Sequence, residues 1–271
     1  MSIKKFIWMN GSEEMKLVIL AGGYGSRLGN LTSSIPKPMI LVGGKPILWH
    51  IMKTYSNYGI KDFIICLGYK GHVIKDYFLH YDSNNNDFTV DLSDNSIKFH
   101  NDHEEADWKV TLVDTGIDTL KGARLKRIEK YLVDDINLLT YGDGVADINI
   151  SELVDFHKNI GKMVTISGVH PPARFGELIA EENILTSFEE KAQTSQGLIN
   201  GGYMVFNKEL LSYLEEDENC DLESGILEKL ASQHKVAVYK HKGLWACMDT
   251  ERDLHHLEKL WKNHEAFWKV W

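Results

Sequence analysis

Glycine and two cations are concentrated in one short stretch, VILAGGYGSRLGNLTSSIPKPM at residues 18–39. Glycine lets backbone N–H groups approach phosphate oxygens closely. Arg27 can offer a planar fork of N–H donors to a polyphosphate. Lys37 stands between Pro36 and Pro38, which stiffen the backbone and could aim its ammonium group. This combination indicates a phosphate site, with a tight strand-to-loop turn that carries a surface arginine as the alternative.

Two common phosphate-binding motifs do not fit this stretch. A dinucleotide-binding loop needs G-x-G-x-x-G at the start of a helix that directly follows a strand. Here GYG is followed by SRL, so the third glycine is missing, and the proline-rich SIPKP stands where the helix should run. The Walker pattern G-x-x-x-x-G-K-[ST] does not occur in the sequence either. A dinucleotide-dependent oxidoreductase and a P-loop ATPase are therefore both disfavoured.

Strand and helix patterns alternate along the chain and would position this stretch. Short apolar runs, KLVILAGG, DFIICLG, VTLVD, INLLTYGDG and MVTISGV, predict strands of a sheet that is buried on both faces. Helical patterns follow in PILWHIMKTYSNYG, HVIKDYFLHY, ARLKRIEKYL and ISELVDFHKNIG, at 221–233, and from about 250 to 262. This alternation predicts an α/β fold with a doubly wound, mostly parallel, Rossmann-like sheet.

Two segments follow a period of two instead. DFTVDLSDNSIKFH alternates around the turn-forming SDNS and predicts a hairpin. From 174 to 206 the period is again mostly two, with a turn at Glu182–Asn183. These segments predict a small antiparallel β lobe.

Composition narrows the class of protein. The chain has 271 residues and a formal charge of −9, which argues against the basic face that nucleic-acid binding needs. No apolar run approaches the roughly 18 residues of a membrane span. Three cysteines without a close pair give no zinc or disulfide framework, so a reducing cytoplasm is expected. Residues 1–14 lack a signal-peptide cleavage pattern and are interpreted as an N-terminal extension.

Longer motifs connect these observations. LAGGYGSRL, PKPM and GGKPILWHIMK resemble the nucleotidyltransferases that join a nucleoside triphosphate to a sugar 1-phosphate. ICLGYKG, WKVTLVDTG, RLKR, LLTYGDGVADI, RFGEL, INGGYMVFN and LWACMDTERDL extend the likeness over nearly the whole chain, in particular to the glucose-1-phosphate cytidylyltransferases. The resemblance implies that residues 15–271 form a single nucleotidyltransferase domain.

The resemblance also implies roles for individual residues. Arg27 would face the leaving phosphates, and Lys37 would bridge the nucleotide and the sugar phosphate; with Asp143 they are the implied catalytic residues. The implied nucleotide-binding residues are Leu20, Ala21, Gly22, Gly23, Tyr24, Gly25, Ser26, Arg27, Thr119, Arg124 and Gly142. The implied sugar-phosphate-binding residues are Lys37, Lys191, Asn200 and Gly201, next to Gly202. For Arg124, an ordinary surface cation at a helix start is the alternative.

By the same resemblance, Asp143 and Asp249 hold Mg²⁺. Magnesium takes hard oxygen ligands, usually one or two carboxylates together with phosphates and water. Asp143 follows a predicted strand at the carboxyl end of the sheet, where such folds bind ligands, and Asp249 closes the last predicted strand. A turn aspartate at 143 and a helix N-cap near 249 are the alternatives.

The implied reaction transfers a cytidylyl group from CTP to glucose 1-phosphate and gives CDP-glucose and pyrophosphate, for deoxysugar or surface-polysaccharide synthesis. The expected partners are these two substrates and further copies of the chain, with no nucleic acid and no membrane. UTP or dTTP, another sugar 1-phosphate, or a catalytically silent nucleotide-binding regulator remain open alternatives. The chain departs from the family pattern at Ile35, Ala192 and Gly225, which bears on the sugar more than on the reaction.

Overall fold

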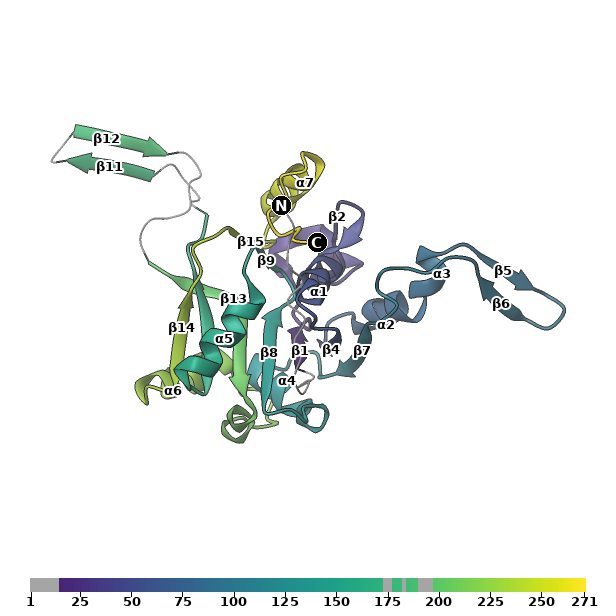
Figure 1. Ribbon diagram of the computed structural model, residues 1–271, viewed down its shortest axis with the longest axis horizontal. Helices are drawn as coiled ribbons and strands as arrows, with labels where there is room; N and C mark the ends of the chain where they lie inside the picture. Colours follow the sequence, from purple (N-terminus) through teal and green to yellow (C-terminus); the bar gives the residue numbers. More distant parts are fainter. Residues whose placement is uncertain (1–14, 173–176, 182–183, 190–196) are drawn as a thin grey trace.

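A computed structural model of the chain describes residues 15–172, 177–181, 184–189 and 197–271. Its centre is a seven-stranded sheet with the strand order β14-β10-β13-β8-β1-β4-β7 (Figure 1). In chain order the strands are β1 (Lys16–Leu20), β4 (Asp62–Leu67), β7 (Lys109–Asp114), β8 (Ile136–Tyr141), β10 (Val164–Val169), β13 (Ile199–Asn207) and β14 (Val236–Lys240). β8, β1, β4 and β7 run parallel, as do β10 and β14, whereas β13 is antiparallel to both of its neighbours. The predicted mostly parallel sheet is confirmed.

Alternate side chains of the central strands enter two separate hydrophobic cores. Leu17 and Ile19 of β1 belong to one core, and Val18 between them belongs to the other. Residues of α1 (Ile47–Asn57), α2 (Gly71–Leu79), α5 (Ile150–Ile160) and α7 (Glu251–Lys262) close the first core, and residues of α4 (Lys121–Arg127) and α6 (Glu228–Ser232) close the second. A strand covered on both faces needs a continuous apolar run, which KLVIL supplies. No helix within the described ranges has both the length and the apolarity to cross a membrane.

The described residues also form four two-stranded antiparallel sheets. These are β2 (Leu41–Val42) with β3 (Lys45–Pro46), β5 (Phe88–Asp91) with β6 (Ser96–Phe99), β9 (Gly144–Ala146) with β15 (Trp245–Cys247), and β11 (Glu177–Glu181) with β12 (Ile184–Glu189). The hairpin predicted from DFTVDLSDNSIKFH is β5–β6, which extends from the body beyond α3 (Tyr81–Asn85) (Figure 1). The turn predicted at Glu182–Asn183 lies outside the described residues.

The continuous helix predicted at 221–233 is wrong. One turn of π-helix, η5 (Leu222–Leu227), precedes α6, and Ser224 and Gly225 inside it have non-helical backbone angles. Gly225 has a φ of +98°, which glycine adopts without the steric cost of a side chain. The first and last residues of η5 are buried, so the spacing of the apolar residues in the sequence resembles that of a helix although the backbone between them is not helical.

His50 of α1 is fully buried among the aromatic residues of the C-terminal segment. Its ring centroid lies 4.8 Å from that of Trp261 and 6.1 Å from that of Trp268. Nε2 is 2.7 Å from the carbonyl oxygen of Val42, to which it donates, and Nδ1 accepts from Trp268 Nε1 at 3.4 Å. Burial, aided by the charge of Lys269, lowers the pKa of His50 to about 4. A proton on Nδ1 would remove the acceptor that Trp268 uses.

We therefore predict that His50 makes the fold less stable in acid. The pKa is lowered from 6.5 to about 4, so stability is complete above pH 6.5 and is lost towards pH 4, by up to roughly 3 kcal/mol at 1.36 kcal/mol per unit. The measurement is the free energy of unfolding in urea at pH 7 and pH 5. His50→Gln, whose amide can still donate to Val42, should show a smaller loss than the wild type. The exposed His256→Gln is the control, and equal losses in all three proteins would contradict the prediction.

Candidate active site

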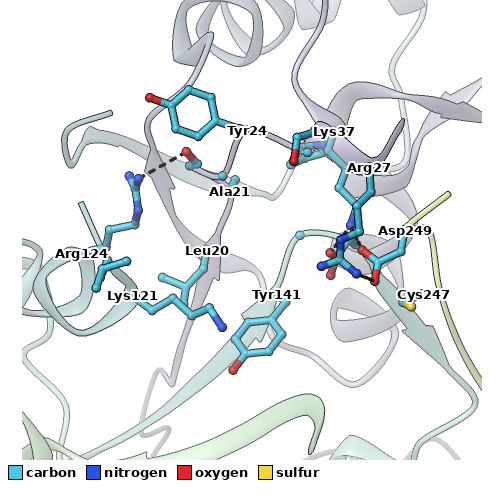
Figure 2. A pocket seen from close by; sticks show the side chains of 18 of the residues that line it. Leu20, Ala21, Tyr24, Arg27, Lys37, Lys121, Arg124, Tyr141, Cys247 and Asp249 are labelled. Atoms are coloured by element: carbon cyan, nitrogen blue, oxygen red, sulfur yellow. Dashed lines mark hydrogen bonds and ion pairs between the residues drawn. The ribbon is translucent and has the colours of Figure 1, made fainter. Parts of the chain in front are cut away.

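A cavity of about 620 Å³ opens at the carboxyl ends of β1 and β8, where parallel sheets usually bind ligands (Figure 2). Its lining includes most of the predicted site residues: Leu20, Ala21, Gly22, Gly23, Tyr24, Gly25, Ser26, Arg27, Lys37, Thr119, Arg124, Gly142, Asp143, Asn200 and Asp249. Gly201 lies behind this surface, buried, and its carbonyl oxygen accepts from Trp245 Nε1 at 2.8 Å. Lys191 lies outside the described residues.

A short antiparallel pair brings the two predicted metal ligands to the same cavity. β9 begins directly after Asp143, β15 ends two residues before Asp249, and Gly144 is paired with Cys247. The N–H of Met248 donates to the carbonyl oxygen of Asp143 at 2.9 Å, which extends the pairing by one step. The helix N-cap of α7 is Thr250, so Asp249 is not used as a cap.

Lys37 joins the two aspartates. Its Nζ lies 2.5 Å from Asp143 Oδ2 and 2.5 Å from Asp249 Oδ1. Lys37 begins a 3₁₀ turn, η2 (Lys37–Met39), directly after the extended Pro36, and its side chain is only 11% exposed. Burial alone would lower the pKa of Lys37, but the charges and hydrogen bonds of the two aspartates outweigh it and raise that pKa. The lysine therefore stays charged between two carboxylates.

Arg27 completes this group from the open side of the cavity. Its Nη1 is 2.7 Å from Asp249 Oδ2, and its side chain is 70% exposed (Figure 2). Burial tends to raise the pKa of Asp249, but the hydrogen bond from Lys37 and the charges of Lys37 and Arg27 lower it overall. Asp249 is thus ionised at neutral pH. Arg27 can leave this contact at little cost, because an exposed ion pair contributes little to stability.

Asp143 and Asp249 have the donor chemistry that a magnesium ion requires. Asp143 Oδ2 and Asp249 Oδ1 converge on one cationic atom, so they lie at most 5.0 Å apart. In the part of the chain that the structure describes, no group of three or more His, Cys, Asp or Glu side chains could hold a metal ion. An ion at this pair would take its other ligands from phosphates and water, as magnesium usually does. The residues fit such an ion.

The glycine loop after β1 is anchored to β4 and to the segment that directly follows it. Ala21 N–H donates to the carbonyl oxygen of Cys66, and Tyr69 N–H donates to that of Gly22. Gly25 has a φ of +64°, and a Cβ there would lie 2.9 Å from the Cβ of Lys37. The glycine is therefore needed for the backbone conformation and for the close approach of the lysine.

Arg124 is buried beneath this loop, with 4% of its surface exposed, which excludes the surface-cation alternative. Its Nη1 donates to the carbonyl oxygens of Leu67 and Gly116 and to Thr115 Oγ1, and its Nη2 donates to the carbonyl oxygens of Gly22 and Ile117. Figure 2 shows the guanidinium directed towards the loop that contains Ala21. The guanidinium thus joins the glycine loop to the segment after β7. Its direct contact with a nucleotide stays a prediction, as does that of Thr119, whose Oγ1 accepts from Arg127 Nη1.

Several residues of the cavity were not found by sequence reasoning. Tyr141, Lys121, Asp118, Trp245 and Cys247 all line it. Tyr24 Oη donates to Asp118 Oδ1 at 2.5 Å and so closes one side. Tyr141 and Cys247 flank the predicted Asp143 and Asp249, and this proximity in sequence was the available signal.

The fold and the cavity define a class of protein. The nucleotidyl transferase family pattern matches residues 16–264, and the chain belongs to that family. It is 48% identical over 258 residues to the glucose-1-phosphate cytidylyltransferases of Salmonella typhi and Salmonella typhimurium, with 95% of the chain and 100% of each relative covered. A probable glucose-1-phosphate cytidylyltransferase of Bacillus subtilis is 42% identical over 257 residues, with the same coverage.

Solved structures show the same fold at lower identity. HddC from Yersinia pseudotuberculosis superimposes with a TM-score of 0.67 at 22% identity, covering 91% of this chain and 99% of that one. A UDP-glucose pyrophosphorylase complexed with UDP-glucose gives a TM-score of 0.65 at 14% identity, covering 92% and 99%. At these identities the similarity shows only that the fold is shared.

Alanine substitutions at two neighbouring glycines test the role of Arg124. A Cβ at Gly22 would lie 2.2 Å from Arg124 Nη1, whereas one at Gly23 would meet no atom within 4 Å. We predict that Gly22→Ala displaces the guanidinium and lowers the free energy of unfolding by about 1–3 kcal/mol, because buried carbonyls lose their donor. Gly23→Ala, the matched control, should unfold like the wild type. Both proteins are measured in urea without nucleotide, and equal stability of the two variants would contradict the prediction.

Proposed function

We propose that this protein transfers a cytidylyl group from CTP to glucose 1-phosphate, giving CDP-glucose and pyrophosphate. The observation that carries the proposal is the 48% identity to glucose-1-phosphate cytidylyltransferases over their whole length. The convergence of Arg27, Lys37, Asp143 and Asp249 on one cavity supports it. A regulator that only binds a nucleotide has no need for this complete set.

In the proposed reaction, a phosphate oxygen of glucose 1-phosphate attacks the α-phosphorus of CTP. The new oxygen–phosphorus bond forms as the bond to the β-phosphate bridging oxygen breaks, and pyrophosphate leaves with the electron pair. Both reactants are anions, so alignment and charge neutralisation are the main contributions that side chains can make. In this proposal Lys37 would hold the two reacting phosphates together, and Arg27 would contact the leaving phosphates. No covalent enzyme intermediate is needed.

The glycine loop would receive the triphosphate. Its backbone N–H groups can reach phosphate oxygens because Gly23 adds no side chain and has open space around its α-carbon. Ser26 begins the 3₁₀ helix η1 (Ser26–Ser33) that follows the loop. Gly142, whose N–H donates to the carbonyl oxygen of Leu20, fixes the distance between this loop and Asp143. Asn200 would contact the sugar phosphate from the side of β13.

A divalent metal ion is used generally in this family. We propose Mg²⁺, held by Asp143 and Asp249, whose charge would offset that of the phosphates. We further propose that residues 15–271 act as one domain, and that the enzyme works in the cytoplasm, where CTP is made, as a homo-oligomer.

The substrate assignment is tested by a panel of four nucleoside triphosphates against several sugar 1-phosphates, scored by pyrophosphate release. We predict that CTP with glucose 1-phosphate exceeds every other pair by at least ~10-fold in kcat/KM, which corresponds to about 1.4 kcal/mol in the transition state. A preference for UTP or dTTP would reject the cytidylyl assignment and leave the fold untouched. Nucleotide binding without turnover of any pair would favour a silent regulator.

The two aspartates should act as one unit. We predict that Asp143→Asn and Asp249→Asn each remove most of the activity, and that the double variant loses little more, because the second change removes a ligand that is already ineffective alone. Each single variant should also need more magnesium for half-maximal turnover. Turnover is measured against magnesium concentration for the wild type and all three variants. Multiplicative losses with an unchanged magnesium midpoint would show that the two residues do not share an ion.

A further inference from the structure

The N-terminus of α7 makes one hydrogen bond more than a helix cap requires. In a capping box, the N-cap side chain accepts from the N–H of the third helical residue, whose side chain accepts from the N-cap N–H. Thr250 and Asp253 form such a box. Asp253 Oδ2 also accepts from the N–H of Asp249, which lies before the cap. This additional hydrogen bond reaches one of the two proposed metal ligands.

A single oxygen atom of Asp253 accepts three hydrogen bonds. Oδ2 lies 2.8 Å from Thr250 N, 2.9 Å from Thr250 Oγ1 and 3.1 Å from Asp249 N. The carboxylate is thus directed at the backbone that precedes the helix. Asp253 is not among the described residues that line the cavity, whereas Asp143 and Asp249 both line it. Its position therefore suits a support for Asp249 and not a third ligand.

The helix that carries Asp253 is itself attached to the segment that carries Lys37. α7 packs against β2 (Figure 1), and β2 follows the η2 turn after one residue. Glu258 Oε1 accepts from the N–H of Gly43, between β2 and β3, at 3.1 Å. A Cβ at Gly43 would lie 2.0 Å from Trp261 Nε1, so the helix and this turn are in close contact. A helix attached in this way can fix Asp249 relative to Lys37.

The hydrogen bond from Asp249 to Asp253 does not depend on the cations of the site. The Asp249 carboxylate is paired with Lys37 and Arg27. Bound phosphates would attract both cations, and the carboxylate would then lose both ion pairs. The backbone hydrogen bond to Asp253 would remain, because both of its groups belong to the start of α7. It would then keep Asp249 in place when an ion binds.

We propose that Asp253 is a positioning residue, which holds the backbone of Asp249 so that the Asp249 carboxylate can bind a divalent ion together with Asp143. The inference rests on the proposed function, because it assumes the metal site of that proposal. Groups that orient metal ligands contribute to metal affinity although they do not touch the ion, and their loss typically weakens binding by about 10–100-fold. Asp253 has this relation to Asp249.

The test measures the binding of Mn²⁺ to the protein with CTP, without sugar phosphate, so that no transfer occurs. The electron paramagnetic resonance signal of free Mn²⁺ gives the Kd, and a titration of CTP alone gives the correction for Mn²⁺ bound by the free nucleotide. For Asp253→Ala we expect a Kd at least ~10-fold above that of the wild type. The magnesium concentration for half-maximal turnover should also rise, while kcat at saturating magnesium stays within about threefold of the wild type.

Matched variants separate positioning from helix capping and from charge. Thr250→Ala removes the N-cap hydroxyl but keeps the acceptor for the Asp249 N–H, so it should lower the urea midpoint of unfolding and leave the Kd for Mn²⁺ within roughly threefold of the wild type. Asp253→Asn keeps an acceptor oxygen without the charge and should also stay within about threefold. Asp249→Asn shows the loss expected when a ligand itself is changed. Urea unfolding of each variant confirms that it is folded.

Equal Mn²⁺ affinity of Asp253→Ala and the wild type would overturn the inference. Equal weakening in Asp253→Ala and Asp253→Asn would assign the effect to charge, equal weakening in Asp253→Ala and Thr250→Ala would assign it to capping, and either result would also overturn it. If the wild type prefers another triphosphate, the cytidylyl assignment fails, and the same titrations with that nucleotide still test Asp253. If Asp249→Asn binds Mn²⁺ like the wild type, Asp249 is not a ligand and the inference is rejected.

Discussion

The site depends on one buried cation shared by two carboxylates. A charge removed from water is costly unless it is paired, and two neighbouring carboxylates repel each other. Lys37, Asp143 and Asp249 therefore satisfy their charges only together, and Arg27 brings the group to electrical balance. Bound phosphates would attract Lys37 and Arg27 away from the two carboxylates, and the carboxylates would then be free to bind a divalent ion. The negative charge of the substrate and the positive charge of the metal would therefore enter the site together. The elements that carry the three residues must stay in fixed relation for this exchange to work.

Local sequence patterns were sufficient to predict the helices and strands, but not to predict which of their ends lie close together in the fold. KLVIL and DFIICL have the continuous apolar composition of strands covered on both faces, and the hairpin at residues 88–99 follows from its alternation and turn residues. The proximity of Asp143 and Asp249 depends on pairing between two three-residue strands, β9 and β15, about a hundred residues apart. Strands this short have no periodicity to detect, so the resemblance to a family, and not the pattern, indicated the pair.

Arg124 and Glu223 show a second limit of sequence reasoning. Arg124 lies in RLKR at a helix start, where a cation is usually exposed, yet its guanidinium holds carbonyl oxygens from three separate segments. Glu223 lies in a stretch whose apolar spacing is helical, but the backbone is not helical at Gly225, and the Glu223 carboxylate contacts Tyr141 and Lys121. In both cases the partners are contributed by distant segments, so the local sequence contains no trace of them.

The charged residues around Lys37 and the hydrogen-bonded residues around Tyr141 are carried by different elements. Lys37 begins η2, Arg27 lies in η1, and the β9–β15 pair brings Asp143 and Asp249 together. Glu223 lies in η5 and Asn200 in β13, and both are hydrogen-bonded to Tyr141 at the end of β8. A change in η5 can therefore alter the partners of Tyr141 without moving the elements that carry Lys37, Asp143 and Asp249. Gly225, where the chain departs from the family pattern, lies within that segment.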